Sequence, residues 1–294
     1  MKRFSAAALL LLLVFIIPVM ALADLEIYYL DVGQADAAFI RCDGHSMMID
    51  GGNPDDSQFI YSFLKNTVKV TELDCVIASH PHDDHIGGLG AAFRACKVGT
   101  LYTTVMEYDN RHFESLLSNA AEQGSNIIVP YVRDHFQLGG AEVTFLSPIY
   151  EYDDLNDLSL VVKITYGNTS FLFTADAGVQ PEYDMIDEGL DLQADVLKIG
   201  HHGSDTSTSF DFLSSVLPCY AVISVGAENS YGHPVAETMA YLEYYGIYVY
   251  RTDLDGTILC TSDGQEISFL TENDVEDEYL RYQAYKPEPT PELD

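Results

Sequence analysis

The chain has 294 residues, of which 47% are hydrophobic, and a formal net charge of −32 at pH 7. This length and hydrophobic content are sufficient to bury a large core, as one large domain or two small ones. The acidity argues against stable binding to duplex nucleic acid or to anionic membranes, and it also serves simply to keep a protein soluble.

The first 23 residues have the pattern of a secretory signal peptide. Lys2 and Arg3 precede an apolar run over residues 6–21, and Ala21 and Ala23 form an A-x-A cleavage site. The pattern predicts a secreted protein that begins at residue 24, with no membrane contact after cleavage. The alternative is an uncleaved anchor, because the run is close to the minimum length for a membrane span.

Short β-rich runs alternate with helical patterns along the rest of the chain. Hydrophobic runs between turn residues predict strands at residues 25–31, 37–41, 46–50, 75–79, 98–104, 142–146, 160–166, 170–175, 195–199, 221–225, 247–251, 257–261 and 266–270. Apolar residues at helical spacing predict helices at residues 57–65, 88–96, 111–123, 209–217 and 235–245. No break in composition divides these elements, so we predict one domain over residues 24–272. The acidic, proline-containing residues 273–294 predict a disordered tail.

The cysteines are scattered along the chain without a C-x-x-C pair, at Cys42, Cys75, Cys96, Cys219 and Cys260. Several lie in apolar, strand-like runs, which predicts buried free thiols. An odd and unclustered set is not a disulfide framework, although it leaves room for one bridge.

The strongest signal for function is the run His80-Pro81-His82-Asp83-Asp84-His85, which follows a predicted buried strand. Such a run is not expected in a hydrophobic core, because buried imidazoles and carboxylates need hydrogen-bond or charge partners. Imidazole nitrogens and carboxylate oxygens are ligands of zinc and similar cations, and a tight loop at a strand's end makes them converge. The run therefore predicts a metal site, in preference to a surface loop that holds three histidines by chance.

Two later positions after predicted strands extend this site. A carboxylate at Asp176 either bridges two cations with its two oxygens or caps the next turn, and the histidine run favours the bridge. His201 and His202 are neighbours, and neighbouring side chains on an extended backbone point apart. One of the two should therefore bind the metal, while the other faces the substrate or supports the ligands. Of the two, we assign His201 as the ligand, and the sequence leaves the choice between them open.

Loop residues provide candidates for contact with the substrate. Ser204 follows the histidine pair and is placed to donate a hydrogen bond to an anionic group. Asn229, Tyr231 and His233 precede a predicted helix, whose N-terminus attracts anions. His233 is either the group that protonates a leaving oxygen or an ordinary loop histidine.

Two aspartates near the first strand are candidates for support of the metal ligands. Asp31 and Asp36 lie on either side of Gly33, where the first predicted strand ends. Carboxylates at such a place either orient the metal-binding side chains or form the turn itself.

The pattern His80-x-His82-x-Asp84-His85 resembles the signature of the metallo-β-lactamase superfamily. The resemblance implies an α+β fold, a four-layer α/β/β/α sandwich with the metal site at one edge of its two sheets. It also implies that His80 and His82 bind one metal ion, and that Asp84 and His85 bind a second. Two divalent ions are thus expected, with zinc first and manganese second.

Four further stretches resemble one branch of this superfamily, the β-lactamase-like domain of the ComEC competence proteins. They are residues 30–36 with Asp50-Gly51-Gly52, residues 171–176 with the bridging Asp176, residues 197–204, and residues 226–234. The branch implies a phosphodiesterase or nuclease that acts on DNA or nucleotides through a metal-activated hydroxide. We assign Asp50 to the support of the metal ligands.

One departure from the superfamily pattern concerns the first metal. Many members have a third histidine before the strand that leads to the bridging aspartate, and Asn156 stands about where it would fall. The competence branch also has Asn and Ser in this stretch. We therefore expect weaker binding on the side of His80 and His82, with Asn156 close to the ligands.

Together these motifs predict a metal-dependent hydrolase in which Asp84, His202 and His233 are catalytic. The substrate is expected to be single-stranded DNA, a strand end or a nucleotide, because the acidic chain opposes a long duplex. The alternative enzyme hydrolyses a lactone, a β-lactam or a thioester at the same metal centre, and would need an apolar pocket. A non-catalytic protein that kept the fold is a further alternative, although the retained ligands argue against it.

Overall fold

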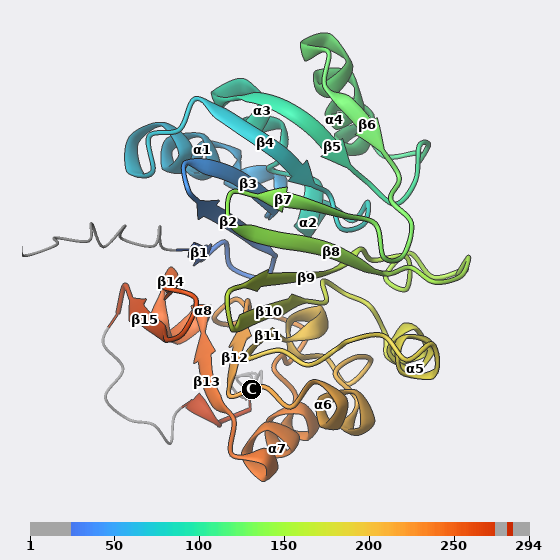
Figure 1. The fold of residues 1–294 in the computed structure, drawn as a ribbon, viewed down its shortest axis with the longest axis vertical. Helices are drawn as coiled ribbons and strands as arrows, with labels where there is room; N and C mark the ends of the chain where they lie inside the picture. Colours follow the sequence, from blue (N-terminus) through green and yellow to red (C-terminus); the bar gives the residue numbers. More distant parts are fainter. Residues whose placement is uncertain (1–24, 274–280, 285–294) are drawn as a thin grey trace, which may run out of the picture.

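The computed structural model describes residues 25–273 and 281–284 of the chain. Within them, two mixed sheets pack against each other, and helices cover the outer face of each sheet (Figure 1). None of the helices in these ranges is long and apolar enough to cross a membrane. The predicted signal peptide lies outside the described residues.

The first sheet has the strand order β15-β14-β1-β2-β3-β4-β5-β6. Its strands are β1 Leu25–Tyr29, β2 Ala37–Cys42, β3 His45–Gly51, β4 Glu72–Ile77, β5 Lys97–Tyr102, β6 Asn126–Ile128, β14 Ile258–Ser262 and β15 Ile267–Thr271. The strands from β3 to β6 run parallel, while β15, β14, β1, β2 and β3 are joined by antiparallel pairs.

The second sheet has the strand order β13-β12-β11-β10-β9-β8-β7. Its strands are β7 His135–Leu138, β8 Ala141–Ser147, β9 Val161–Tyr166, β10 Thr169–Phe173, β11 Val196–Lys198, β12 Tyr220–Ile223 and β13 Tyr248–Arg251. The strands from β10 to β13 are parallel. Their carboxyl ends therefore open at one edge of the sheet, which is where loops in such sheets collect functional groups.

The helices are short, and they connect the strands on the outside of the sandwich. They are α1 Ser57–Ser62, which continues as a π-helical turn over Phe63–Thr67, α2 Asp83–Ile86, α3 Gly90–Ala95, α4 Arg111–Gln123, α5 Val179–Asp187, α6 Phe210–Val216, α7 Ala236–Tyr245 and α8 Thr252–Asp255. Two 3-10 turns accompany them, at Pro54–Asp56 and Gly200–Gly203.

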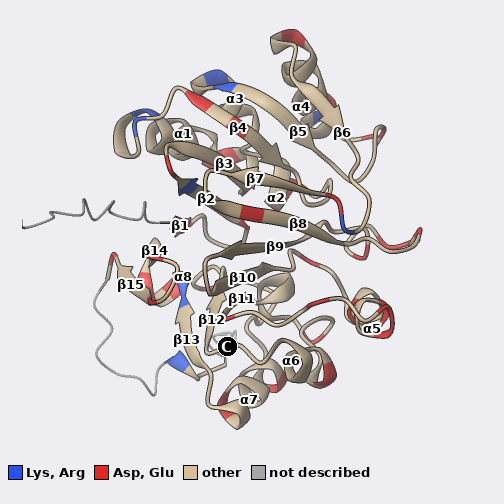
Figure 2. Ribbon diagram, in the orientation of Figure 1, with Lys and Arg blue, Asp and Glu red and all other residues tan. Residues whose placement is uncertain are grey.

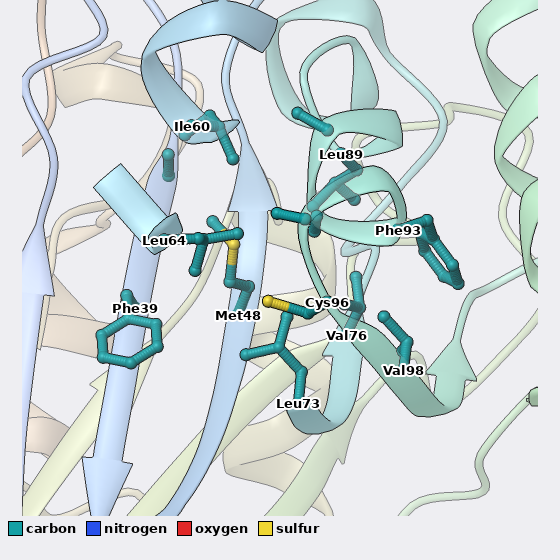
Figure 3. Close-up of a cluster of buried hydrophobic side chains, with 14 of the residues drawn as sticks. Phe39, Met48, Ile60, Leu64, Leu73, Val76, Leu89, Phe93, Cys96 and Val98 are labelled. Carbon is teal, nitrogen blue, oxygen red and sulfur yellow. The ribbon is translucent and has the colours of Figure 1, made fainter. Parts of the chain in front are cut away.

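Three buried clusters separate the four layers. The central cluster joins the two sheets, with Ile27 and Met47 from the first and Val143 and Phe171 from the second. A second cluster lies between the first sheet and α1, α3 and α4 (Figure 3). A third lies between the second sheet and α5, α6 and α7. Alternation of buried side chains along the strands thus produces the predicted α/β/β/α sandwich.

The structure adds elements that the hydrophobic pattern did not predict. The strands β6 and β7 are short, and α5 is rich in acidic residues and contains Pro181 near its start. Proline is tolerated in a first helical turn, where the backbone N–H has no intrahelical partner. None of these segments has the long apolar periodicity on which sequence interpretation depends.

The end of the chain departs in part from the predicted disordered tail. Arg281 is buried, and its guanidinium lies 2.6 Å from Asp255 and over the rings of Tyr248 and Tyr250. Residues 281–284 are therefore packed on the domain. The five cysteines are free in the described structure, and all except Cys219 are buried.

Candidate metal centre

The metal-binding run begins where β4 ends, and Asp50 fixes its first turn. The backbone N–H of Ser79 donates to Oδ1 of Asp50 at 2.8 Å, and the Ser79 hydroxyl donates to Oδ2 at 2.7 Å. Gly51 and Gly88 let the segment after the run approach the end of β3, since a Cβ on Gly88 would lie 2.0 Å from the carbonyl oxygen of Gly51. The run from His80 to His85 is thereby held against the end of β3.

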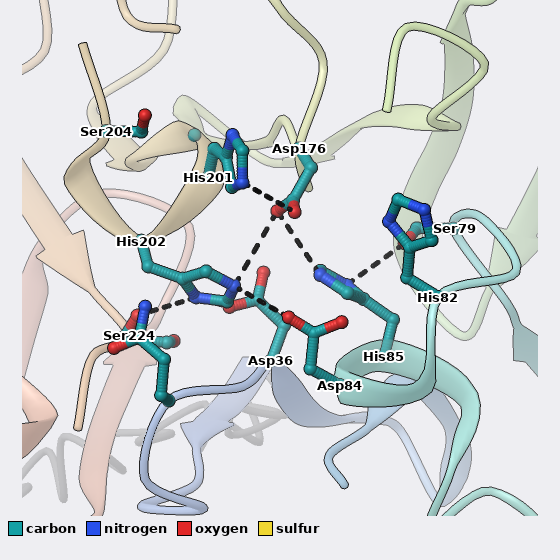
Figure 4. A network of polar contacts seen from close by, with 12 residues as sticks. Asp36, Ser79, His82, Asp84, His85, Asp176, His201, His202, Ser204 and Ser224 are labelled. Carbon is teal, nitrogen blue, oxygen red and sulfur yellow. Dashed lines mark hydrogen bonds and ion pairs between the residues drawn. The ribbon is translucent and has the colours of Figure 1, made fainter. Parts of the chain in front are cut away.

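Four side chains from three separate segments form a compact cluster. Asp84 and His85 come from α2, Asp176 from the loop after β10, and His202 from the turn after β11 (Figure 4). One ligand atom of each lies within 4.8 Å of those of the others. Nε2 of His85 is 3.2 Å from Oδ1 of Asp176, and Nε2 of His202 is 3.4 Å from Oδ2 of Asp84.

Two buried carboxylates hold the histidines of this cluster from behind. Oδ2 of Asp50 lies 2.8 Å from Nδ1 of His85. Nδ1 of His202 hydrogen-bonds to the carbonyl of Ser224 at 3.0 Å, and Oδ1 of Asp36 lies 3.2 Å from the same nitrogen as an ion-pair contact. The Asp36 carboxylate also accepts a 2.9 Å contact from the buried ammonium of Lys198. A carboxylate at Nδ1 fixes the ring and leaves Nε2 free to bind a metal. We call Asp84, His85, His202 and Oδ1 of Asp176 the carboxylate-backed half of the centre.

Several features of this half fit a divalent cation. Nε2 of His85, Nε2 of His202 and Oδ1 of Asp176 are buried without a hydrogen-bond partner, although such atoms are normally satisfied. Burial alone would lower the pKa of His202, but the carboxylates of Asp176 and Asp36 raise it to about 10, so a proton occupies the metal-free ring and a cation would have to displace it. The cluster thus attracts positive charge strongly, and its imidazole and carboxylate donors are suited to zinc or manganese.

Another group of ligands lies on the other side of Asp176. Nε2 of His80 is 3.0 Å from Nδ1 of His82 and 3.8 Å from Oδ2 of Asp176. Nδ1 of His80 faces the hydroxyls of Ser79 at 3.1 Å and Ser159 at 3.4 Å. We call His80, His82 and Oδ2 of Asp176 the hydroxyl-backed half. Burial and the neighbouring His85 lower the pKa of His80 well below its ordinary value, which keeps its ring neutral as metal binding requires.

The histidine pair after β11 differs from the sequence-based prediction. His201 and His202 lie in a turn with left-handed φ angles of 47° and 56°, not on an extended backbone. Both side chains therefore reach Asp176, His201 at Oδ2 and His202 at Oδ1 (Figure 4). His202, which we expected to face the substrate, is the one inside the compact cluster. The geometry thus favours His202 over His201 as the ligand of the carboxylate-backed half.

The loop after β12 contains the remaining predicted substrate residues. Asn229 makes its side-chain hydrogen bonds within this loop, to the backbone of Gly226, Tyr231 and His233. It therefore shapes the loop, and the predicted contact with substrate is not supported. Tyr231 is 70% exposed, and its ring lies 5.7 Å from that of His233 at an interplanar angle of 27°.

His233 and Ser204 lie beside the histidine pair. The ring of His233 is 5.8 Å from that of His201, and its Nδ1 is 3.3 Å from Nε2 of Gln34. Burial, together with His201 and His202, lowers the pKa of His233 to about 4. A neutral imidazole is a poor proton donor, which opposes the predicted acid role. Ser204 is buried, and its hydroxyl contacts that of Thr206 at 3.0 Å.

Asp31 and Asn156 make no side-chain hydrogen bond to a ligand within the described residues. Asp31 is exposed, and its carboxylate accepts from the backbone of Gly33 at 3.2 Å, so it forms the turn. Oδ1 of Asn156 is buried without a hydrogen-bond partner. The position next to His80 belongs instead to Ser159, whose hydroxyl also accepts from the backbone N–H of Asp176 at 3.3 Å.

Sequence interpretation missed Ser79, Ser159, Thr206 and Lys198 as parts of the site. Lys198 carried a usable signal, because a lysine inside the apolar run of β11 is rarely buried unless it is paired. The hydroxyl residues carried none, since serine and threonine are common in loops for reasons unrelated to ligands.

Comparison with known proteins agrees with this architecture. Residues 30–226 match the sequence model of the Metallo-beta-lactamase superfamily. ComE operon protein 3 of Bacillus subtilis is 31% identical over 268 residues, which cover 84% of this chain and 34% of that protein. Competence protein ComA of Neisseria gonorrhoeae is 30% identical over 230 residues, which cover 78% of this chain and 31% of that protein. The chain thus spans about a third of the length of these curated relatives.

A solved structure shows the same fold. The metallo-beta-lactamase fold protein YhfI from Bacillus subtilis superposes with a TM-score of 0.54 at 14% sequence identity, covering 83% of this chain and 99% of that one. At this identity the likeness concerns the fold alone, and it confirms the predicted four-layer sandwich.

Proposed function

This chain belongs to the metallo-beta-lactamase superfamily of metal-dependent hydrolases, and we propose that it is a phosphodiesterase that cleaves single-stranded DNA or a smaller nucleotide. The observation that carries the proposal is the position of Asp176. Its Oδ1 faces His85 and His202, while its Oδ2 faces His80 and His201. If two cations bind, each oxygen of this carboxylate would face the ligands of one of them, an arrangement suited to displacement at a phosphodiester.

Different residues of the chain have different roles at this centre. Asp50 fixes the ring of His85, and the carbonyl of Ser224 together with Asp36 fixes that of His202, so that both Nε2 atoms point inward before any cation arrives. Two cations held there would activate water and neutralise the negative charge that develops on the substrate. With its lowered pKa, His233 is neutral at pH 7, so it is suited to accept a hydrogen bond or a proton from the reacting groups rather than to donate one.

The charge distribution supports a small or single-stranded substrate. Aspartates and glutamates are spread over α5, α6 and α7 and the adjoining loops, with few lysines or arginines (Figure 2). Duplex binding depends on many basic contacts to phosphates, so a long duplex is opposed. The names of the relatives, a ComE operon protein and a competence protein, are consistent with a DNA-related role.

No observation favours the alternative of lactone, β-lactam or thioester hydrolysis. That alternative needs an apolar pocket at the metal centre. A mostly apolar cavity does border Asp36, Asp50 and Lys198, but its volume of about 10 Å³ leaves room for about one water and not for such a substrate. A larger apolar groove in the described structure, lined by Phe59, Phe63, Leu259 and Leu270 among others, contains none of the metal-centre residues. We also propose that the protein is exported, on the basis of its N-terminal sequence.

Hydrolysis assays with defined metals test the proposal. The protein is stripped with a chelator, reloaded with zinc or manganese, and given bis-p-nitrophenyl phosphate and single-stranded DNA. We expect metal-dependent cleavage that His80→Ala and Asp176→Ala abolish, while His45→Ala, which removes an exposed histidine paired with Asp74, leaves it unchanged. Rapid turnover of nitrocefin or a lactone without phosphodiester cleavage would contradict the proposal.

A further inference from the structure

We propose that residues 281–284 cover a sheet edge that pairs with a second copy of this chain when these residues are released. We call residues 281–284 the C-terminal strap. The edge belongs to β13, which lies at one end of the strand order of the second sheet. The inference concerns self-association, so it is independent of the metal centre and of the proposed phosphodiesterase activity.

The backbone of β13 faces away from the sheet at every second residue. In the parallel pair with β12, the N–H of Tyr248 donates to the carbonyl of Cys219 at 3.1 Å, so the backbone groups of Tyr248 point toward β12. Backbone groups alternate in direction along a strand, and those of Ile247, Val249 and Arg251 therefore point outward. Such a row on an edge strand is a template for pairing with another chain.

The C-terminal strap occupies the outward carbonyls with side chains. The Tyr282 hydroxyl donates to the carbonyl of Ile247 at 2.7 Å, and the Arg281 guanidinium donates to the carbonyl of Val249 at 3.3 Å. The strap forms no strand of its own within the described residues. It therefore fills the places that the N–H groups of a neighbouring strand would take, without extending the sheet.

A buried ion pair and two aromatic rings hold the strap in place. The guanidinium of Arg281 lies 2.6 Å from Asp255, which also accepts from the outward N–H of Arg251 at 2.8 Å. The same guanidinium lies 5.4 Å and 5.3 Å from the ring centroids of Tyr248 and Tyr250, within the range of a cation–π contact. Release of the strap therefore exposes aromatic ring faces together with the outward carbonyls.

The sequence of β13 favours pairing once its edge is exposed. Residues 247–251 are β-branched or aromatic except for the last, and they include no acidic residue and no proline. Segments of this kind pair readily as strands. Their one charged residue, Arg251, is neutralised by Asp253 at 2.6 Å. By contrast β15, the edge of the first sheet, lies between the exposed Glu266 and Glu272, and charges beside an edge strand oppose pairing.

The partner that fits this edge is the same edge of a second chain. Two β13 strands related by a two-fold axis run antiparallel, so that outward carbonyls of one meet outward N–H groups of the other. The net charge of −32 opposes any association of two chains. We therefore expect pairing to strengthen as added salt screens this repulsion.

A rival interpretation gives the strap a role in stability alone, since Tyr282 and Ala284 also pack against the third buried cluster. The two interpretations differ in what loss of the strap produces. Loss of a segment that only stabilises the fold lowers the free energy of unfolding and leaves a single chain. Loss of a segment that covers an edge gives folded chains that associate through that edge.

The test measures the mass of the full-length protein by sedimentation at low and high salt. Arg281→Ala is combined with Asp255→Asn, because an unpaired buried carboxylate would itself unfold the domain, whereas asparagine still accepts from the N–H of Arg251. We expect this double variant to reach twice the mass of the wild type, most completely at high salt. Arg133→Ala is the matched control, because it removes an exposed arginine that donates to a backbone carbonyl elsewhere, and it should keep the wild-type mass.

Hydrogen exchange locates the contact between the two copies. Amides of residues 247–251 should exchange more slowly in the associated variant than in the wild type, while those of β15 are unchanged. A variant that unfolds at lower urea concentration but keeps the wild-type mass at every salt concentration would overturn the inference. Association with new protection at β15, and none at residues 247–251, would overturn it as well.

Tyr282→Phe tests the same edge with a smaller change, and it decides the question if the double variant does not fold. It removes the hydroxyl from the carbonyl of Ile247 and leaves the ion pair of Arg281 intact. We expect a fraction of this variant to associate at high salt, with slower exchange at residues 247–251. A wild-type mass at every salt concentration would contradict the inference.

Discussion

The two halves of the metal centre share Asp176 but are supported by different chemistry. In the carboxylate-backed half, Asp50 and Asp36 hold His85 and His202 through charged contacts deep in the sandwich. In the hydroxyl-backed half, only neutral hydroxyls face Nδ1 of His80. A carboxylate partner raises the basicity of an imidazole ligand more than a hydroxyl does. The structure thus teaches that one fold can build a strong and a weak cation site side by side, and we expect the carboxylate-backed half to fill first.

The largest expected effect comes from the residue that the two halves share. Asp176→Ala removes a ligand from both, so we expect both ions to be lost and hydrolysis to fall more than about 100-fold, beyond the effect of losing a supporting residue. Metal analysis after dialysis, together with assays on bis-p-nitrophenyl phosphate, measures this. A variant that still binds two ions with wild-type affinity would show that Asp176 does not join the halves.

Lys198 distinguishes the halves by charge, because its ammonium contacts the carboxylate-backed half alone through Asp36. Lys198→Met leaves that buried carboxylate without its cation, and breaking a buried pair costs about 3–5 kcal/mol. We expect the metal-free protein to lose stability by about this amount in urea denaturation, while the more negative site binds its first ion more tightly. Equal destabilisation with and without metal would contradict this link.

Glu182 provides a pH-dependent test of the loop that holds His201. Burial raises the pKa of its carboxyl to about 7, against hydrogen bonds from the backbone of Ser209 and Thr208 that lower it. The folded state therefore prefers the protonated form. The stabilisation is present below the ordinary pKa of the carboxyl and is lost as the pH rises through 7.

We therefore expect the wild type, relative to Glu182→Gln, to lose about 2–3 kcal/mol of stability between about pH 5 and about pH 8. Urea denaturation of both proteins at several pH values measures the difference, and the common titration of the metal ligands cancels. Glu122→Gln, an exposed glutamate on α4, serves as the matched control and should show no such trend. A difference independent of pH would contradict the raised pKa.

These residues also show where sequence interpretation stops. The sequence could predict the sandwich, the run from His80 to His85, and Asp176. Hydrophobic runs indicate the strands, and histidines and aspartates, which are common metal ligands, follow directly where these strands end. Support by Asp36 and Asp50 could be predicted as well. The different positions of the His201 and His202 side chains at Asp176 could not be predicted, since they depend on two left-handed residues that no local pattern indicates.

Contacts that arise only from tertiary packing could not be predicted from the sequence either. Ser159 meets His80 across 79 residues, and Glu182 meets Thr208 across 26 residues. Neither serine nor glutamate in a loop or a surface-like helix is distinctive by type. Their roles follow from which segments the two sheets bring to one edge, and that information is spread over the whole chain.

The smallest effects should come from the residues that contact Nδ1 of the ligand histidines. The ratio of the two losses in metal affinity shows how differently the two halves are supported. Asp50→Asn removes the charge behind His85, so we expect the first ion to bind about 10–100-fold more weakly. Ser159→Ala removes one of two hydroxyls near His80, at a contact of 3.4 Å, so the second ion should weaken less than about tenfold. Titration of the metal-free variants with cobalt gives both affinities. If Ser159→Ala weakens its ion as much as Asp50→Asn weakens the other, the hydroxyl partner contributes as much as the carboxylate, and the difference between the two halves must arise from the number of ligands rather than from their support.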